Sequence, residues 1–154
     1  MGISKRNYVT QMEKYKKCLY RVAYSYMNDK TLALDALDEA IYKGYINRGK
    51  LKNEECFKTW LTRIVVNECL QLLRKNKREV LIDEIPEEAT EAFDTLPIRD
   101  ALGKLSQELA SIIYLRFFGG YTLAETAAIL KVPQGTVATR ERKALALLKL
   151  ELEE

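Results

Sequence analysis

The chain of 154 residues contains no histidine, only three cysteines and three prolines, and a single tryptophan. Without histidine, Ser–His–Asp and Cys–His nucleophile systems are excluded, and the commonest general base of enzymes is missing. The cysteines, Cys18, Cys56 and Cys69, are widely spaced and form no Cys-x-x-Cys pair, which argues against a zinc site or a disulfide framework. We interpret them as small, reduced core or half-buried residues. Carboxylate or lysine chemistry stays open, but no glycine-rich phosphate loop is present. The composition therefore favours a protein that is not an enzyme and binds no cofactor or metal.

Long apolar runs are also missing. No segment approaches the ~20 apolar residues that cross a bilayer, and no secretory apolar core follows the amino-terminal sequence Met1-Gly-Ile-Ser-Lys-Arg. Met1-Gly2 is only a fragment of a myristoylation signal, because Arg6 stands where Ser or Thr is expected. We expect a cytoplasmic protein without membrane insertion. The hydrophobic (47%) and charged (31%) fractions are typical of a folded globular chain, long enough for one ordinary domain or two small ones.

Positive and negative charges are segregated along the chain. Residues 57–78 carry six basic side chains and one acid, residues 79–98 carry seven acids and no base, and residues 131–149 carry five basic side chains and one acid. Two basic segments separated by an acidic connector favour two contacts with a polyanion, made by separate modules. Solvated helix faces would explain either basic segment alone, so the interpretation depends on both being present in one chain.

Apolar residues recur three and four positions apart in nearly every long segment, as in amphipathic helices. We expect helices over residues 7–27, 31–45 and 53–77, with Thr31 capping the second. The second helix is expected to bury Leu34, Leu37, Ala40 and Ile41. The third is expected to bury Phe57, Trp60, Leu61, Ile64, Val65, Cys69, Leu72 and Leu73.

Residues 79–95 lose this periodicity and combine acids, Pro86 and small residues, which predicts a linker that is at most partly ordered. Helical signals resume at Pro97, and Ser106 is expected to cap a further helix that ends at Gly119-Gly120. No segment alternates with a period of two over a length that could support a sheet. The pattern predicts an all-α fold of two small helical domains joined by a flexible acidic linker.

Residues 121–140 have the pattern of two short helices joined by a tight turn. Thr122 is expected to cap the first helix, Lys131-Val132-Pro133 interrupts the pattern, and the second helix is expected to begin near Gln134, with Gly135 in its first turn. This is the arrangement of a helix-turn-helix, whose second helix lies in the DNA major groove. Any tight helical hairpin has a similar rhythm, so the pattern alone leaves DNA binding open.

Taken together, these segments resemble the sigma subunits of bacterial RNA polymerase. The resemblance is carried by Phe57-Lys-Thr-Trp-Leu-Thr-Arg-Ile-Val-Val-Asn-Glu-Cys-Leu-Gln-Leu-Leu-Arg-Lys-Asn-Lys-Arg78, by Leu105-Ser-Gln-Glu, and by the helix-turn-helix with Gly135-Thr-Val137. The chain is similar in particular to the compact extracytoplasmic-function group, which keeps only domains two and four. These would be residues 5–78 and 97–152, with residues 79–96 as the linker.

The resemblance implies a non-enzymatic transcription initiation factor. Its partners would be core RNA polymerase, promoter DNA and an anti-sigma factor, and it would have no small-molecule substrate. The helix that holds Asp35, Asp38, Glu39 and Ala40 would bind a coiled coil of the polymerase clamp. Asp38 stands where the family often has Gln. A solvated helix face is the alternative interpretation of these acids.

The third helix would read the −10 element of the promoter as single-stranded bases. Its polar residues fall three or four positions apart, and amide side chains suit base edges whereas basic ones suit phosphates. By resemblance, the loop from Asn47 to Asn53 would hold a flipped base. Trp60 could stack on a base, but it also aligns with the apolar stripe of the helix. The expected −10 residues are Trp60, Arg63, Asn67, Gln71, Arg74 and Lys75.

The second helix of the helix-turn-helix would read the −35 element as duplex DNA. The expected contacts, which include backbone amides at the helix start, are Gln134, Gly135, Thr136, Thr139, Arg140, Arg142 and Lys143. Arg140 could instead be structural, paired with Glu125.

Two residues depart from the family pattern. A basic residue is common at Ala138, and an apolar residue is usual at Glu141, which must therefore reach solvent or find a basic partner. These departures favour one alternative, a sigma-like adaptor that binds polymerase without reading DNA. A stand-alone helix-turn-helix regulator is the other, and it leaves residues 57–78 and the acidic second helix unexplained.

Overall fold

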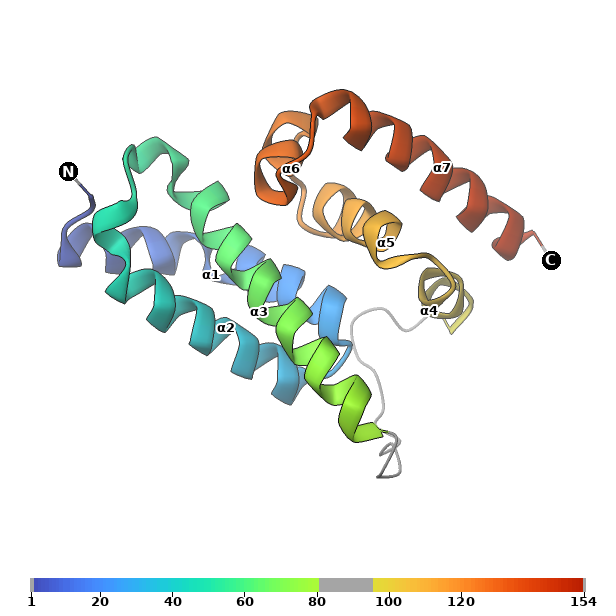
Figure 1. The fold of residues 1–154 in the computed structure, drawn as a ribbon, viewed down its shortest axis with the longest axis horizontal. Helices are drawn as coiled ribbons and strands as arrows, with labels where there is room; N and C mark the ends of the chain where they lie inside the picture. The colour runs from blue at the N-terminus through green and yellow to red at the C-terminus, as the bar shows by residue number, and fades with distance from the viewer. Residues whose placement is uncertain (1, 81–95, 154) are drawn as a thin grey trace. The chain divides into compact units, whose positions relative to one another are not determined.

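The computed structural model describes residues 2–80 and 96–153, with side chains from 2–75 and 97–153. All regular elements in these ranges are helical, which confirms the predicted all-α fold (Figure 1). The chain divides into two compact units, Met1–Glu87 and Glu88–Glu154. Most of the predicted linker, residues 81–95, lies outside the described ranges. Within the described residues, no helix is both long and apolar enough to span a bilayer.

The first unit contains three long helices, α1 (Lys5–Met27), α2 (Lys30–Ile46) and α3 (Phe57–Val80), each of which packs against the other two. Two short 3₁₀ turns, η1 (Arg48–Lys50) and η2 (Glu54–Cys56), connect α2 to α3. The third helix is expected from residue 53, but α3 begins at Phe57 and the turn η2 precedes it. Asn53 caps this turn, since its side chain accepts a hydrogen bond from the backbone N–H of Glu55. The largest fully buried side chains of this unit are Tyr8, Leu19, Val22, Leu37, Phe57, Leu61 and Val65.

The cap of α2 differs from the prediction. Asp29, not Thr31, caps this helix: its Oδ1 accepts a hydrogen bond of 2.9 Å from the backbone N–H of Leu32. The preceding Asn28 adopts a left-handed conformation that ends α1 at Met27, so the cap of α2 lies two residues earlier than expected. Asp29 is then extended, as an N-cap residue must be, whereas Thr31 already lies inside the helix.

The buried stripe of α2 also differs from the prediction. The residues that face the core are Ala33, Ala36, Leu37, Ala40 and Gly44, whereas Leu34 is 39% exposed and Ile41 is half-buried. α2 lies against both α1 and α3, so small side chains let the backbones approach closely. A Cβ added at Gly44 would lie only 2.6 Å from the Tyr8 hydroxyl oxygen.

The second unit contains α4 (Leu96–Gly103), α5 (Gln107–Ile113), a π-helical turn η3 (Tyr114–Phe118), α6 (Leu123–Leu130) and α7 (Gln134–Leu152). α7 packs against α4, α5 and α6. The predicted cap of α5 is confirmed, since Ser106 Oγ accepts a hydrogen bond of 3.3 Å from the backbone N–H of Leu109. The centre of this unit is a buried cluster of Ile112, Ala127 and Val137, against which Leu123, Leu130 and Val132 pack.

Candidate nucleic-acid and polymerase interfaces

The polar residues predicted on the third helix share one open face of α3. Asn67, Gln71, Arg74 and Lys75 are exposed, and Arg63 is half-exposed. At ~1.5 Å per residue, the face from Trp60 to Lys75 is about 22 Å long. This length allows contact with several consecutive nucleotides, with amide groups for base edges between cations for phosphates.

Trp60 is partly in the core and partly accessible to a base, the two alternatives that the sequence left open. Its ring packs against Phe57, with the ring centroids 6.2 Å apart, yet the residue remains half-exposed. The indole therefore anchors the start of α3 to the core and presents part of its surface to solvent. A base could stack on that part without any rearrangement of the core.

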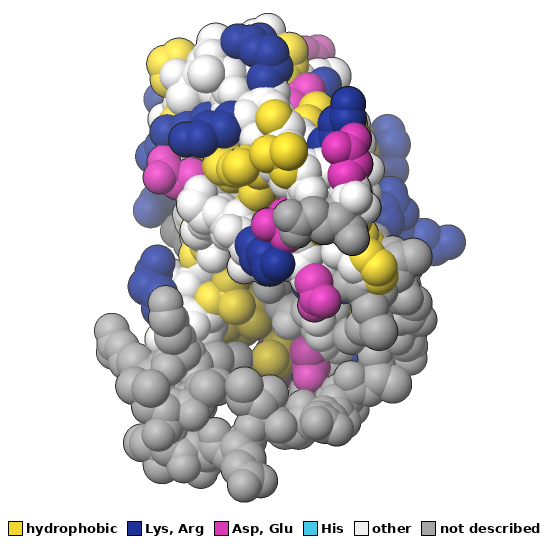
Figure 2. All heavy atoms as spheres, turned by 90° about the vertical axis from the view of Figure 1, so that its right-hand side faces the viewer, with side chains coloured by type: hydrophobic (Ala, Val, Ile, Leu, Met, Phe, Trp, Pro, Cys, Tyr) yellow, Lys and Arg dark blue, Asp and Glu magenta, His cyan; other side chains and the backbone are white. Residues whose placement is uncertain are grey.

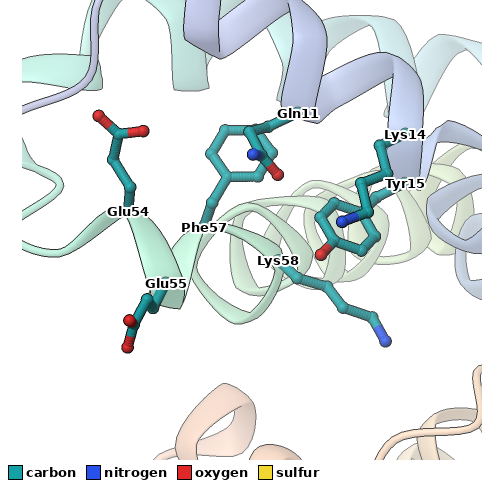
Figure 3. A pocket seen from close by; sticks show the side chains of 7 residues that line it. All are labelled: Gln11, Lys14, Tyr15, Glu54, Glu55, Phe57 and Lys58. Atoms are coloured by element: carbon teal, nitrogen blue, oxygen red, sulfur yellow. The ribbon is translucent and has the colours of Figure 1, made fainter.

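A pocket of about 230 Å³ lies between α1 and the start of α3 (Figure 3). Tyr15 stacks against Phe57 at a centroid distance of 6.4 Å, and the amino groups of Lys14 and Lys58 lie 5.3 and 5.7 Å from the Tyr15 centroid. Figure 3 shows Glu54 and Glu55 on the other side of Phe57 from these lysines. The pocket thus combines an aromatic surface, cations and carboxylates, which together suit a nucleotide.

Sequence reasoning missed the contribution of α1 to this pocket. Gln11, Lys14 and Tyr15 lie about forty residues before Glu54 and Lys58 in the chain, and only the packing of α1 on α3 brings them to the same pocket. The one signal in the sequence is Tyr15, an aromatic residue that falls with Tyr8, Met12 and Leu19 on the apolar stripe of the first expected helix.

The loop from Asn47 to Asn53 is held against the core of the first unit by Leu51 and Arg48. Leu51 is 3% exposed, and the Arg48 guanidinium donates a hydrogen bond of 2.8 Å to the backbone oxygen of Tyr45 while lying 4.3 Å from the centroid of its ring. Lys50 and Lys52 are exposed. The loop therefore has a fixed base and two exposed cations at its surface.

Of the four residues predicted to bind polymerase, the three acids lie on the solvent-exposed face of α2 and the alanine does not. Asp35, Asp38 and Glu39 are exposed, but Ala40 is completely buried in the core and cannot contact a partner. The sequence placed Ala40 both in the core and on the interface, and the packing of α2 assigns it to the core alone.

An apolar groove of about 510 Å³ lies beside these acids, between α1 and α2. Its lining combines apolar and aromatic side chains with a largely basic rim, and consists of Glu13, Lys16, Lys17, Tyr20, Arg21, Leu34 and Leu37. Leu34, which the sequence assigned to the core, is therefore at the groove. Tyr42 and Ile46 on the same helix are 60% and 56% exposed. Apolar side chains left open to solvent in this way are typical of a protein-binding surface.

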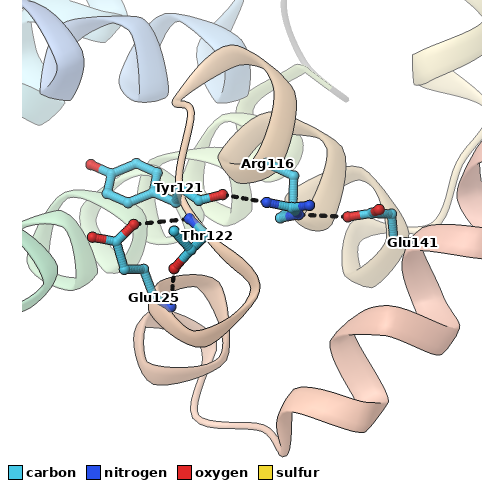
Figure 4. Close-up of polar contacts among 5 residues, drawn as sticks. All are labelled: Arg116, Tyr121, Thr122, Glu125 and Glu141. Carbon is cyan, nitrogen blue, oxygen red and sulfur yellow. Dashed lines mark hydrogen bonds and ion pairs between the residues drawn. The ribbon is translucent and has the colours of Figure 1, made fainter.

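The first helix of the helix-turn-helix begins with a capping box. Thr122 Oγ1 accepts a hydrogen bond of 3.0 Å from the Glu125 backbone N–H, and Glu125 Oε1 accepts one of 2.8 Å from the Thr122 N–H (Figure 4). Glu125 is therefore engaged at its own helix terminus. The predicted pairing of Arg140 with Glu125 is wrong, since Arg140 Nη2 lies 3.0 Å from Glu108 Oε2 of α5.

Glu141 has found a basic partner, as its place on the apolar stripe of α7 requires. Arg116 in η3 donates through Nε to Glu141 Oε1 at 2.6 Å and through Nη1 to the backbone oxygen of Tyr121 at 2.7 Å (Figure 4). The Tyr121 side chain is fully buried. One guanidinium thus links α5, through its π-helical end, to the turn before α6 and to the middle of α7.

The predicted −35 residues lie mainly on the open side of α7. Gln134, Gly135, Thr139, Arg142 and Lys143 are exposed, whereas Thr136 and Arg140 are half-buried. α7 begins directly after Pro133, and no side chain of the described residues caps it. The backbone N–H of Thr136 donates a hydrogen bond of 3.0 Å to the Pro133 oxygen, and those of Gln134 and Gly135 are available to an anion such as a DNA phosphate.

Four leucines towards the end of α7 are open to solvent, on two sides of the helix. Leu145, Leu147, Leu150 and Leu152 are between 38% and 63% exposed. Figure 2 views the molecule towards this end of α7 and shows apolar side chains exposed between positive and negative ones. Exposed leucines on a helix of a small domain are typical of a contact with another polypeptide.

Comparison with known proteins identifies the family. Sigma-70 region 2 matches residues 12–79, and Sigma-70 region 4 matches residues 101–150. RNA polymerase sigma factor SigV of Bacillus subtilis is 33% identical over 94% of this chain and 90% of its own length. The ECF RNA polymerase sigma factor SigM of Mycobacterium tuberculosis is 30% identical over 88% of this chain and 71% of its own length.

Two solved structures share the fold. The sigma factor RpoE of Bartonella quintana, in complex with the anti-sigma factor NepR, superposes with a TM-score of 0.79 at 22% identity, over 96% of this chain and 98% of RpoE. CnrH, in complex with the cytosolic domain of CnrY, superposes with a TM-score of 0.77 at 21% identity, over 97% and 90% of the two chains. Because both regions match in order and the relatives match over most of their length, the chain belongs to the sigma-70 family of bacterial RNA polymerase, as a sigma factor of the extracytoplasmic-function (ECF) group.

Proposed function

We propose that this sigma factor reads its promoters with two separate surfaces and binds core polymerase with a third. Residues 5–78 act as domain two and residues 97–152 as domain four, joined by the linker at 79–96. Because polymerase and promoter DNA occupy the bacterial cytoplasm, the protein works there. As a sigma factor it is non-enzymatic, and the energy for promoter opening comes from captured bases.

The −10 element binds along the open face of α3. The observation that carries this proposal is the alternation of exposed amides with cations from Arg63 to Lys75, next to the aromatic pocket at Tyr15 and Phe57. A melted strand would lay its phosphates on the cations, its bases on Asn67 and Gln71, and one flipped base near the pocket and the adjoining loop.

The −35 element binds at the start of α7. Its uncapped first turn accepts a phosphate, and Thr136, Thr139, Arg142 and Lys143 reach the major groove. Arg140 plays a structural part through Glu108, so we assign it a smaller share of DNA binding than its exposed neighbours. Ala138 provides no cation, so the affinity of this surface for −35 DNA depends on the neighbouring Thr139, Arg142 and Lys143.

Core polymerase binds the acidic outer face of α2 together with the neighbouring groove. Asp35, Asp38 and Glu39 provide charge for a basic helical partner, and Leu34 and Tyr20 provide apolar contacts. An anti-sigma factor would inhibit by covering the groove on the first unit and the leucines at the end of α7. The similar RpoE and CnrH structures contain such partners.

Reconstituted transcription tests the promoter-reading part of the proposal. The protein is mixed with purified core polymerase, complex formation is measured, and run-off transcription is then assayed on genomic promoters. We expect Asn67→Ala/Gln71→Ala to retain core binding and to lose most promoter-specific transcription. Thr10→Ala, an exposed change on α1, serves as the matched control. Full transcription by the double variant would exclude this face of α3 as the reader.

Charge reversal tests the core-binding part. Asp35→Lys/Asp38→Lys should weaken complex formation with core polymerase, because each change replaces attraction to a basic helix by repulsion. Glu153→Lys, at the end of α7, changes an exposed acid far along the chain and is the control. Equal affinities for the two variants would remove the outer face of α2 from the interface.

A further inference from the structure

The first residues of the chain lie on the loop that we assign to the flipped base. Residues 2–7, which we name the amino-terminal strap, precede and begin α1. The backbone N–H of Ile3 donates a hydrogen bond of 3.2 Å to the backbone oxygen of Arg48, and the Ile3 side chain is only 4% exposed. The same Arg48 oxygen accepts a bond of 3.3 Å from the Leu51 N–H, which closes the loop.

Gly2 makes this approach possible. It adopts a left-handed conformation with φ +79°, and a Cβ at this position would lie 2.7 Å from the Gly49 Cα and 2.9 Å from the Arg48 oxygen. Both the conformation and the contact therefore exclude any larger residue without a shift of one backbone or the other. Two backbones pack directly on one another here, with no flexible side chain between them.

A second attachment lies at the far end of the strap. Ser4 caps α1: its Oγ accepts a hydrogen bond of 3.1 Å from the backbone N–H of Asn7, whose side-chain amide donates a hydrogen bond of 3.3 Å to Glu54 Oε1. Glu54 lines the aromatic pocket. The strap thus contacts the loop at Arg48 and Gly49 and the pocket at Glu54, while Lys50 and Lys52 stay exposed.

We propose that the amino-terminal strap positions the loop from Asn47 to Asn53 and so helps to determine which base the loop accepts from the melted promoter strand. The inference rests on the proposed reading of the −10 element by the first unit. Strap residues contact no DNA themselves. They are positioning residues, because a loop with a fixed backbone discriminates bases by hydrogen-bond geometry, whereas a loose loop accommodates several bases.

The test uses the full chain with core polymerase on a promoter library. The −10 and −35 positions are randomised separately, and transcribed templates are sequenced to give a base preference at each position. The variants are Ile3→Ala, which removes the buried anchor, Gly2→Ala, which strains the backbone contact, and the milder Asn7→Ala. Val9→Ala, an exposed apolar change on α1, is the control, and Ile3→Val is the conservative rescue.

We expect Ile3→Ala and Gly2→Ala to reduce the preference at one −10 position. A single base-pair change in a recognised site typically alters affinity about 5- to 150-fold. At the affected −10 position, we expect the ratio between the preferred base and the other bases to fall to about 2 or less in these variants. Preferences at −35 and the affinity for core polymerase should not change. Ile3→Val should restore the −10 preference, and hydrogen exchange of the Leu51 amide should be faster in Ile3→Ala than in Val9→Ala.

The contrary results are distinct. If the wild-type protein shows no base preference at any −10 position, the proposed reading of this element fails and the inference fails with it. If the wild type discriminates and the strap variants, Asn7→Ala included, keep the same preferences, the loop is positioned without the strap and only the inference is overturned. A uniform loss of transcription with unchanged relative preferences would likewise show a merely structural role.

Discussion

The link between Arg116 and Glu141 gives a quantitative prediction for the second unit. Arg116→Met removes the bond of 2.6 Å to Glu141 and the bond of 2.7 Å to the Tyr121 backbone oxygen. The side chains of Arg116 and Glu141 are only 25% and 19% exposed, so water cannot fully replace the guanidinium as the hydrogen-bond partner of Glu141. Both bonds have the charged guanidinium as donor, and a hydrogen bond of this kind contributes about 1.5–3 kcal/mol when buried and less where solvent reaches it. We expect a loss of roughly 2–4 kcal/mol in unfolding free energy.

A second substitution separates the ionic contribution from simple loss of packing. In Arg116→Met/Glu141→Leu, no charge is left on the apolar stripe of α7, and only the Tyr121 oxygen lacks its donor. The double variant should therefore recover most of the loss and remain about 1 kcal/mol below the wild type. The second substitution should thus recover about 1–3 kcal/mol of the unfolding free energy that Arg116→Met loses.

Urea unfolding with two probes measures this change. Far-UV circular dichroism follows the helices of both units, whereas fluorescence reports on the first unit alone, because Trp60 is the single tryptophan. The shift should appear in the circular dichroism component of the second unit and leave the fluorescence midpoint in place. If the double variant is as unstable as Arg116→Met, or if Arg116→Met costs less than about 1 kcal/mol, the pair does not stabilise the helix-turn-helix as we argue.

Three further predictions concern the core of the first unit and the surface of α7. Gly44→Ala should destabilise the first unit by about 1–3 kcal/mol, because a Cβ there overpacks against the Tyr8 hydroxyl; thermal unfolding followed by tryptophan fluorescence checks this, and an unchanged midpoint would contradict it. Burial raises the pKa of Tyr8 to about 12. An unfolded tyrosine loses its proton near pH 10, so stability is retained below that pH and falls between pH 10 and 12, by roughly 2–3 kcal/mol. Tyr8→Phe should lack this part of the alkaline loss in urea titrations at each pH, and an identical loss in both proteins would refute the assignment. Lys143→Ala should weaken binding to all −35 duplexes alike and lower the slope of log affinity against log salt by about 1; fluorescence anisotropy at several salt concentrations measures the slope, which stays constant if Lys143 contacts no phosphate.

The corrections to α2 show why periodicity alone did not identify its buried face. The periodicity predicts a buried stripe of Leu34, Leu37, Ala40 and Ile41, of which Leu37 and Ala40 do face the core. Since α2 lies against two neighbours, its closest approach to them requires alanine and glycine. By hydrophobicity alone, Leu34 would be buried before Ala33. Close packing of helices favours the smaller side chain, so Ala33 is buried and Leu34 is exposed. The same error hid the groove between α1 and α2, because Leu34 had been assigned to the interior.

The partners of charged side chains were equally hard to predict. Glu125 and Arg140 occur on neighbouring helices of the motif, which suggested a pair between them. The capping box engages Glu125 locally, and Arg140 instead reaches Glu108 on α5. Local hydrogen bonds depend on residues three positions apart and can be read from the chain, whereas an ion pair between helices depends on their crossing geometry.

The sequence by itself determined the helices, the caps at Ser106 and Thr122, the helix-turn-helix and the family, because these follow from local spacing and from motifs of contiguous residues. The polar face of α3 belongs to the same class, since residues three and four apart on one helix must lie together. Only the tertiary structure decided that Ala40 is buried, that Tyr15 joins Phe57 in a pocket, that Arg116 neutralises Glu141, and that Gly2 and Ile3 lie against Arg48 and Gly49. Each of these contacts joins segments distant in the chain, so its geometry is set by how the helices pack.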